Sequence, residues 1–312
     1  MKQINKISII TPVYNRADCL PRCIDSVLCQ DFENWEMIIV DDGSKDGSVS
    51  VAESYCEKDL RIRLFCFAQN KGTNAARNKA IAESTGDYIL ILDSDDWLCD
   101  NVLSKVCDTI QSNQGFSHYI FQADDLLEYY DHNTLLNKGG EVILCFEDWL
   151  SQKVKGDFIH VIKRSIMCEY PFDEKTRILE GVNFMRFYKA GQKQLYSPFV
   201  VTHRDRGRND SVTPSAYLLN EQAMVRCLLA NFAWLSYFTA DCERMELYKV
   251  LFTKRRIVAI LSLAMGKYLE YDKLLSLDKN IGNWKLKIVR KLHLAYLFRQ
   301  LIFCVTRLKN RK

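Results

Sequence analysis

The sequence predicts an α/β fold, in which a mostly parallel β-sheet is flanked by helices and followed by a helical C-terminal extension. Strand-like and helix-like segments alternate four times before residue 113, which is the pattern of βαβ units with right-handed crossovers. The strand-like segments are short, apolar and rich in β-branched residues, as in strands that are buried on both faces. We therefore expect one sheet-containing domain over residues 1–215 and a helical region over residues 216–312.

Local hydrophobic patterns predict each element in order. Short apolar runs predict four strands, at residues 6–11, 36–40, 61–67 and 88–92. Helical periodicity predicts a helix after each strand, at residues 18–30, 48–57, 74–83 and 101–112. In the first helix, Leu20, Ile24 and Val27 fall on one face, which we expect to pack on the sheet. Further along, residues 161–164 and the run before His203 are strand-like.

The composition indicates a globular protein with a core, since 48% of the 312 residues are hydrophobic and 26% are charged. The first residues lack the pattern of a secretory signal, and no apolar stretch reaches the length of a membrane span. The 12 cysteines are scattered, and Cys19 and Cys23 have no second pair to complete a zinc site. We therefore expect reduced thiols and a cytoplasmic protein.

The net charge of +4 is unevenly distributed along the chain. After Asp278 there are ten Lys and Arg residues and no acid, whereas the preceding part carries 33 basic and 39 acidic residues. The positive charge is therefore a C-terminal feature, and we expect no nucleic-acid partner.

A polar cluster follows each predicted strand. The four clusters are Pro12–Asn15, Asp41–Ser44, Asn70–Thr73 and Asp93–Asp96. Because the carboxyl ends of parallel strands meet at one edge of a sheet, where ligands bind, we expect the clusters to form one binding site. The sequence lacks a G-x-G-x-x-G after the first strand and a G-x-x-x-x-G-K-[ST] anywhere, which argues against a dinucleotide dehydrogenase and a P-loop enzyme.

The fourth cluster places three carboxylates within four residues, directly after an apolar strand. Neighbouring carboxylates repel one another, and a divalent cation relieves that repulsion. Asp93 and Asp95 are two residues apart, so their side chains point the same way on an extended backbone. The pair predicts a site for Mn²⁺ or Mg²⁺. The alternative is a turn in which an aspartate caps the following helix.

Together the motifs resemble the family 2 glycosyltransferases. They are P-V-Y-N at 12–15, V-D-D-G-S-x-D-G-S at 40–48, N-K-G-x-x-x-A-R-N at 70–78 and L-D-S-D-D at 92–96. The resemblance covers roughly residues 5–215 and implies the GT-A fold. It implies a bacterial enzyme that moves a sugar from a nucleotide-sugar donor, expected to be a UDP-sugar, to an acceptor hydroxyl of a growing glycan. It also implies inversion of the anomeric centre and dependence on Mn²⁺ or Mg²⁺.

The resemblance assigns roles in donor binding residue by residue. Tyr14 is expected to stack on the base, Asp42 to accept a hydrogen bond from a base N–H, and Arg77 to face a phosphate or the base. Asp93 and Asp95 correspond to the metal-binding D-x-D, with Asp95 as the expected direct ligand. The same motifs add Pro12, Asn70 and Ser94 to the nucleotide-sugar site.

The general base falls where this sequence departs from the family. The family carries Glu-Asp before an apolar helix, and this chain has Glu180 followed by Gly181. Glu180 is the nearest carboxylate and our candidate base for the acceptor hydroxyl, with Asp173 and Glu174 in reserve. The alternative is that Glu180 only begins the helix, where its charge favours the positive helix end.

A basic loop begins after His203, with arginines at 204, 206 and 208. The family has a basic or His-containing loop here that closes over the diphosphate, and Arg204 is assigned to that role because arginine pairs bidentately with phosphate. The alternatives are a solvated surface loop and, for His203, a metal ligand. Histidines 118, 132, 160 and 293 stand alone in the sequence and receive no chemistry.

Residues 216–238, 243–267 and 284–311 are predicted to be helical, and the last segment carries an apolar stripe flanked by basic residues. The stripe contains Ile288, Leu292, Ala295, Phe298, Ile302 and Val305. Such a helix can lie peripherally on the anionic inner face of the cytoplasmic membrane, which would suit a lipid-linked glycan acceptor. Alternatively, the stripe packs on the first domain or forms a homodimer.

Two other functions stay open. A sugar-phosphate nucleotidyltransferase also uses a Mg²⁺-binding acid pair on an α/β sheet, but its Gly-rich signature is absent after Thr11. A catalytically degenerate nucleotide-sugar-binding subunit would account for Gly181 in place of the family's aspartate.

Overall fold

The computed structural model describes residues 6–176, 180–205 and 220–309. The chain divides into two compact units, Met1–Asn209 and Asp210–Lys312. The predicted boundary after residue 215 lies outside the described residues.

The first four predicted strands and helices are confirmed. The strands are β1 (Ile7–Val13), β2 (Trp35–Asp41), β3 (Ile62–Cys66) and β4 (Tyr88–Ile91). The helices are α1 (Leu20–Leu28), α2 (Ser48–Cys56), α3 (Thr73–Glu83) and α4 (Val102–Ser112). The remaining elements of the first unit are β5 (Trp97–Leu98), β6 (His118–Ala123), α5 (Leu127–His132), β7 (Val142–Cys145), α6 (Phe146–Leu150), β8 (Ile159–Lys163), α7 (Arg164–Glu169), α8 (Gly181–Gly191) and β9 (Lys193–His203).

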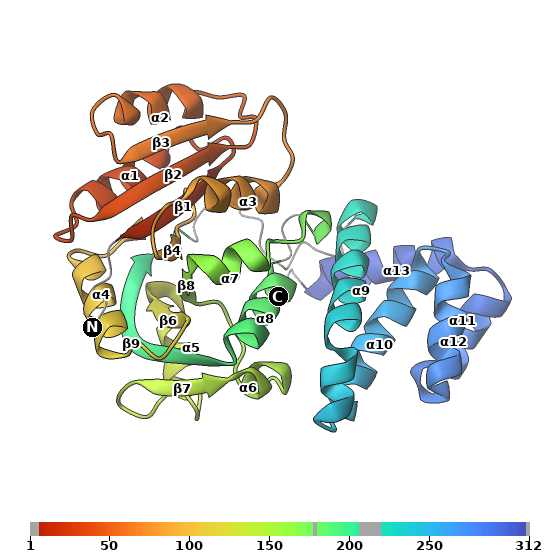
Figure 1. Ribbon diagram of the computed structural model, residues 1–312. Coiled ribbons are helices and arrows are strands. Elements are labelled where there is room, and N and C mark those ends of the chain that lie inside the picture. Colours follow the sequence, from red (N-terminus) through yellow and green to blue (C-terminus); the bar gives the residue numbers. More distant parts are fainter. Residues whose placement is uncertain (1–5, 177–179, 206–219, 310–312) are drawn as a thin grey trace. The chain divides into compact units, whose positions relative to one another are not determined.

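Within the described residues, nine strands form one sheet in the order β3-β2-β1-β4-β8-β6-β9-β5, with β7 paired to β9 beside this path. β1 pairs in parallel with β2 and β4, β2 with β3, and β6 with β9. β8 runs antiparallel to both of its neighbours, β4 and β6. The predicted α/β fold with a mostly parallel sheet is confirmed, and the reversed β8 brings its amino end to the edge where β4 ends (Figure 1).

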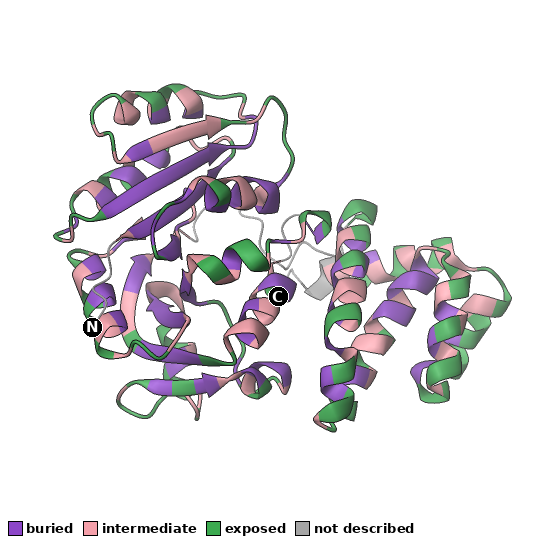
Figure 2. Cartoon of the chain, viewed as in Figure 1, coloured by how far each residue is buried: buried purple, intermediate pink, exposed green. Residues whose placement is uncertain are grey.

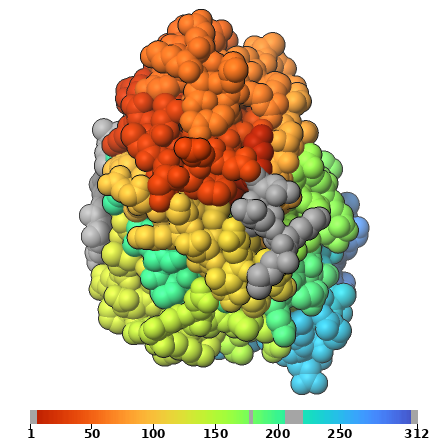
Figure 3. Space-filling view, turned by 60° about the vertical axis from the view of Figure 1, so that its left-hand side comes forward, coloured from red at the N-terminus to blue at the C-terminus, as the bar shows by residue number. Residues whose placement is uncertain are grey.

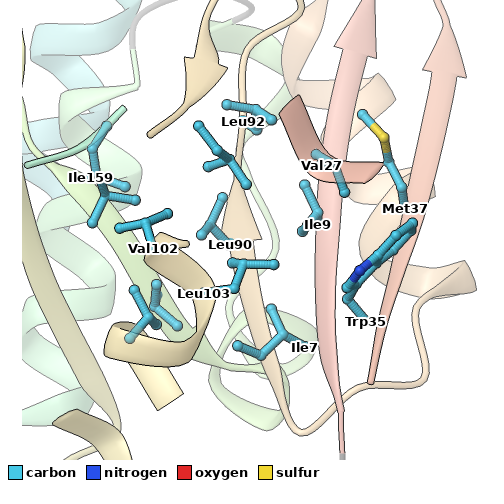
Figure 4. Packing of buried hydrophobic residues seen from close by; sticks show 14 of the residues in the cluster. Ile7, Ile9, Val27, Trp35, Met37, Leu90, Leu92, Val102, Leu103 and Ile159 are labelled. Carbon is cyan, nitrogen blue, oxygen red and sulfur yellow. The ribbon is translucent and has the colours of Figure 1, made fainter. Parts of the chain in front are cut away.

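Helices cover both faces of the sheet, because successive strand residues point to opposite faces. On one face, Ile7 and Ile9 of β1 pack in a cluster with Val27 of α1 and Leu103 of α4 (Figure 4). On the other face, Ile10 packs in a cluster with residues of α3, α7 and α8. The central strands are buried along their length (Figure 2), as the continuous apolar runs predicted.

The chain order is visible on the surface of the first unit. In Figure 3 the red and orange residues of the βαβ segment cover one contiguous part of the face, and the yellow and green segments cover the part next to it. The sheet therefore joins an early and a late half of this unit across β4 and β8.

The second unit is helical. Its helices are α9 (Glu221–Arg244), α10 (Tyr248–Ala264), α11 (Tyr268–Leu277), α12 (Trp284–Lys291) and α13 (Ala295–Lys309). They share a core that includes Leu228, Val258 and Tyr271. None of the described helices is both long and apolar enough to cross a membrane.

The prediction of one continuous terminal helix over residues 284–311 is wrong. The backbone at His293 is left-handed, with φ at 53°, and this conformation ends an α-helix. The predicted stripe is divided accordingly: Ile288 and Leu292 are exposed, whereas Phe298 and Ile302 pack against the helical core.

Candidate active site

The predicted polar clusters meet at one edge of the sheet. Asp93 follows β4, Arg204 follows β9, and Asp157 precedes the reversed β8. A pocket at this edge is lined by residues of both halves of the unit, and its polar members are Arg77, Asp93, Asp96, Asp157, His160, Glu180, Thr202 and Arg204. The expectation of a common site at the carboxyl ends of the strands therefore holds for the acidic cluster after β4.

Arg77 is the centre of this pocket. Its side chain comes from α3 and is 1% exposed. One terminal nitrogen lies 2.7 Å from Asp93 Oδ1, and the other lies 2.5 Å from Glu180 Oε1. Burial alone would lower the pKa of the guanidinium, but Glu180 and Asp93 raise it, so Arg77 stays charged. Arg77 was expected to face a phosphate or the base, and in the structure it lies between two carboxylates.

Glu180 and Asp93 are thereby held in one site, although 87 positions separate them in the sequence. Glu180 is the N-cap residue of α8, yet its side chain makes no capping hydrogen bond. It pairs with Arg77, so its role is more than that of a helix start. Burial raises the pKa of the Glu180 carboxyl, and Arg77 opposes this rise.

The reserve carboxylates of Asp173 and Glu174 do not line the pocket. Asp173 Oδ1 accepts a hydrogen bond from a backbone N–H within its own turn, and Glu174 Oε1 accepts one from Asn78. Gly181 has open space around the position of a Cβ atom, so a larger residue would fit there.

The three aspartates after β4 have different surroundings. Asp93 is 47% exposed and pairs with Arg77, and Asp95 Oδ2 lies 3.7 Å from Arg16. Asp96 is more buried, and burial, together with the nearby Asp93, raises its pKa to about 8 against the opposing charge of Arg204. Among the described residues, no set of three or more His, Cys, Asp and Glu side chains is arranged to hold a metal ion.

The expected base-binding residues lie at the ends of β1 and β2. Tyr14 follows β1 with its side chain 43% exposed, and Pro12 is buried within β1. Asp42 is buried, and its two carboxylate oxygens accept hydrogen bonds from the backbone N–H groups of Lys71 and Gly72. Asp42 thus fixes the loop before α3 as well as standing at the predicted base site.

Two further residues assigned to donor binding differ in exposure. Asn70 is exposed in the loop before α3, whereas Ser94 is buried and its backbone oxygen accepts a hydrogen bond from Cys19. The positive φ of 100° at Gly72 requires a residue without Cβ at the turn into α3. The glycine in the N-K-G motif therefore has a structural reason.

Arg204 is buried among carboxylates rather than open to solvent. Its guanidinium lies 2.9 Å from Asp157, 3.6 Å from Asp125 and 3.7 Å from Asp96. Burial lowers its pKa, but these acids raise it above the usual value. Arg206 and Arg208 of the predicted basic loop lie outside the described residues.

His203 has partners for both ring nitrogens. Nδ1 lies 2.8 Å from Asp124 Oδ2, and Nε2 lies 3.4 Å from Cys99 Sγ. These contacts connect the end of β9 to the residues that follow β5 and β6.

Sequence reasoning placed Asp96 in the acidic cluster of the site but missed Asp157 and His160 as pocket residues. His118 and His160, which stand alone in the sequence and received no chemistry there, form a buried pair with 3.0 Å between Nε2 of His118 and Nδ1 of His160. The one available signal was the strand character of the run after Asp157, because a reversed strand brings its first residues to the ligand edge.

The first unit is an α/β sheet with a charged pocket at the carboxyl ends of its strands, which is where α/β proteins bind their ligands. The family model described as Glycosyl transferase family 2 matches residues 8–167. The chain belongs to this family and is a glycosyltransferase of the kind found in bacterial glycan biosynthesis, as the sequence motifs predicted.

Relatives and solved structures agree with this assignment. A Campylobacter jejuni protein named GalNAc(5)-diNAcBac-PP-undecaprenol beta-1,3-glucosyltransferase is 29% identical over 216 residues, which are 68% of each chain. TarS 1-349 of S. aureus, solved in complex with UDP-GlcNAc, has a TM-score of 0.60 at 17% identity, and the match covers 98% of this chain and 91% of that one. The Pyrobaculum calidifontis mannosyltransferase PcManGT, solved with GDP-Man and Mn²⁺, has a TM-score of 0.58 at 14% identity, with 97% and 86% covered.

Proposed function

We propose that this glycosyltransferase moves one sugar from a UDP-sugar to an acceptor hydroxyl with inversion of the anomeric centre. The observation that carries the proposal is the pairing of Asp93 and Glu180 with different nitrogens of Arg77 in one pocket. Asp93 would then act at the diphosphate of the donor, and Glu180 would act at the acceptor hydroxyl. The UDP-GlcNAc in the staphylococcal neighbour supports a UDP-sugar donor.

The nucleoside would lie at the ends of β1 and β2. The exposed ring of Tyr14 offers a flat surface on which a base can stack. Asp42 would accept a hydrogen bond from a base N–H, since each carboxylate oxygen has a second lone pair beyond its bond to the backbone.

Asp93 and Asp95 would hold Mn²⁺ or Mg²⁺ next to the diphosphate. Two carboxylates fit such an ion when phosphate oxygens and water supply the remaining ligands, which is the usual arrangement for Mg²⁺. When bound, the ion neutralises charge on the leaving diphosphate. The Mn²⁺ in the Pyrobaculum neighbour supports this cofactor. Asp95→Ala should abolish the dependence of UDP binding on Mn²⁺ in a calorimetric titration, and unchanged Mn²⁺-dependent affinity would remove Asp95 from the site.

Glu180 would act as the general base. It takes the proton of the acceptor hydroxyl, whose oxygen then attacks the anomeric carbon from the face opposite the diphosphate and so inverts that centre. A carboxyl whose pKa is raised by burial is closer to the value that suits a base near neutral pH.

Substitution at Glu180 tests this role. Glu180→Gln should reduce turnover by about 10²–10⁴ and leave donor affinity nearly unchanged. Because Gly181 has room for a side chain, Gly181→Asp in the Glu180→Gln background should restore part of the activity. A fully active Glu180→Gln enzyme would instead direct attention to Asp173 and Glu174.

The reaction products separate the proposal from its two alternatives. A transferase releases UDP or GDP from the nucleotide sugar, a nucleotidyltransferase releases pyrophosphate, and a degenerate binding subunit releases neither. One incubation with UDP-sugars, Mn²⁺ and glycan acceptors, and a second with UTP, Mg²⁺ and a sugar 1-phosphate, followed by analysis of the released phosphate species, decide among the three.

For the acceptor, we infer a lipid-linked glycan and peripheral contact with the inner face of the cytoplasmic membrane. Large apolar side chains on α12, on α13 and between these helices are exposed, and they include Trp284, Leu292, Tyr296, Leu297 and Leu301. Lysines at positions 285, 287 and 291 accompany them on α12, and each adds about 1 kcal/mol on an anionic surface. The undecaprenol in the name of the Campylobacter relative supports the lipid-linked acceptor.

Liposome flotation tests the membrane contact. Removal of everything after Asn283 is a poor variant, because Leu286 and Phe303 belong to the helical core. Trp284→Ser combined with Leu297→Ser changes only exposed positions and should lower binding to anionic liposomes without loss of fold. If the full chain ignores such liposomes, or if the double variant instead splits a dimer, this surface is a protein contact.

A further inference from the structure

His160 lines the pocket, and the proposed mechanism gives it no role. His160 of β8 lines the pocket together with Glu180, Asp157 and Phe184. Its ring is 5% exposed and stacks on Phe184 with 4.1 Å between the ring centroids. Its Nδ1 lies 3.0 Å from Nε2 of His118, which β6 contributes from the adjacent strand.

Stacked rings behind the pair hold it in place. His118 stacks on Tyr188 at 5.2 Å, and Tyr188 stacks on Trp149 at 4.0 Å. Trp149 is fixed in turn, since its Nε1–H donates a hydrogen bond to Gln194. His160 is therefore rigid, which makes its free ring edge a defined feature of the pocket.

The hydrogen-bond pattern assigns the tautomers of the pair. Burial lowers the pKa of His118 to about 3, and burial followed by the proximity of His118 lowers that of His160, so both rings are neutral at pH 7. One ring must then donate to the other. Nδ1 of His118 has no hydrogen-bond partner in the part of the chain that the structure describes.

A buried N–H without an acceptor is rarer in proteins than a buried lone pair without a donor. This preference favours the tautomers in which Nδ1 of His118 is unprotonated and Nε2–H of His118 donates to Nδ1 of His160. With these tautomers the proton of His160 is on Nε2, for which no described residue supplies a hydrogen bond.

We propose that His160 is a specificity-determining residue whose Nε2–H donates a hydrogen bond to a hydroxyl oxygen of the donor sugar. This inference rests on the proposed function and deepens it. The charged groups of the pocket are acids, which accept, and two arginines already paired with acids. The N–H of His160 is a neutral hydrogen-bond donor among these charged groups. It is matched by an uncharged acceptor oxygen, which a sugar hydroxyl has and a phosphate does not.

The donor sugar is favoured over the acceptor for two reasons. His160 shares its pocket with Asp93, the residue proposed to lie beside the diphosphate. A ring that is 5% exposed is also reached only by a group that enters the pocket fully. A site built to bond a sugar hydroxyl discriminates against sugars that lack it, because its polar group is then left unpaired.

Two substitutions separate the contacts of the ring. His160→Asn keeps an amide near the Nδ1 position, and so keeps the bond to His118, but it does not reach the Nε2 position. His160→Gln places an amide N–H near Nε2 and gives up the bond to His118. Trp149→Phe is the matched control, because it alters the same stack without lining the pocket.

Calorimetric titration with UDP, UDP-glucose and UDP-GlcNAc in the presence of Mn²⁺ tests the proposal. His160→Asn should weaken binding of the preferred UDP-sugar by about fivefold to tenfold, the scale of one hydrogen bond, and leave UDP affinity unchanged. His160→Gln should retain most of the affinity, and Trp149→Phe should lower thermal stability without changing the ratio of the UDP-sugar and UDP affinities.

Equal effects of His160→Asn on UDP and UDP-sugar, or no effect on either, would overturn the assignment, and so would an effect confined to the acceptor KM. Should that variant not fold, monodeoxy analogues of the donor sugar serve on the wild-type protein. At least one of them should bind about fivefold to tenfold more weakly than its parent, and uniform binding of the series would overturn the assignment. A wild-type protein that binds neither UDP nor any UDP-sugar contradicts the proposed function itself.

Discussion

Replacement of Arg77 by methionine should destabilise the protein by about 2–4 kcal/mol at pH 8 and by clearly less at pH 5. Removal of one partner from a buried ion pair costs roughly 3–5 kcal/mol, because the other charge is left uncompensated. Arg77 is 1% exposed, but Asp93 and Glu180 are 47% and 29% exposed, so water screens part of the loss.

The pH dependence follows from Glu180. Burial raises the pKa of its carboxyl, and without Arg77 this rise is less opposed. In the variant, folded Glu180 therefore holds a proton at pH values where the unfolded chain, with a glutamate pKa of about 4.3, has released it. Because the folded state binds more protons, the free energy of unfolding falls as the pH rises from about 4.3 through the raised pKa.

Urea denaturation at pH 5 and pH 8 measures this effect. In a Glu180→Gln background, Arg77→Met should cost at least about 1 kcal/mol less than in the wild type, since only the half-exposed Asp93, and no longer Glu180, is left without its partner charge. Arg77→Lys, which keeps the charge, is the matched control. A loss that is the same at both pH values and in both backgrounds would refute the reasoning and leave Arg77 as a packing residue above the ring of Phe172.

Three further substitutions test the fold around the site. Burial alone would raise the pKa of Glu36, but hydrogen bonds led by that from Ser8 lower it to about 2, so Glu36→Gln should cost about 2–3 kcal/mol at pH 7. This loss should disappear as the pH falls from about 4.3 to 2, and a pH-independent loss in urea melts would contradict it. Gln30→Ala removes the acceptor for two backbone N–H groups at the start of α4 and the donor to the carbonyls of Ser26 and Cys99, and it should lower the free energy of unfolding by about 2 kcal/mol in urea melts, where an unchanged value would contradict it. Asp42→Ala should lower the free energy of unfolding by about 1–3 kcal/mol and weaken UDP binding, because it releases the loop before α3. Unchanged UDP affinity would show that the base binds elsewhere.

Local patterns were sufficient to predict the early half of the first unit. Strands and helices up to residue 112 have strong periodicity, and the rule that ligands bind at the carboxyl ends of strands correctly gathered the acidic cluster after β4 into a pocket. The same rule could not reveal that Arg77 pairs with Glu180, because that contact joins α3 to α8 and depends on tertiary packing.

The later half of the first unit was harder to predict from the sequence. Its strands are short, and their order in the sheet differs from their order in the chain. β8 has five residues, and only its pairing between β4 and β6 makes His160 a wall of the pocket and a neighbour of His118. The helix break at His293 was not predicted from the sequence, because the apolar stripe continues across the residue at which the backbone becomes left-handed.

The place of β8 in the sheet also has a consequence for the chain during its synthesis. β4 pairs with β1 on one side and with β8 on the other, so a nascent chain that ends before residue 159 leaves one side of β4 unpaired. An unpaired strand edge is a template for association with other chains. Such a chain carries all four family motifs and Arg77, but it has neither Glu180 nor Arg204. Synthesis of the motifs therefore precedes assembly of the pocket, and the interval between them is when the chain is most exposed to aggregation.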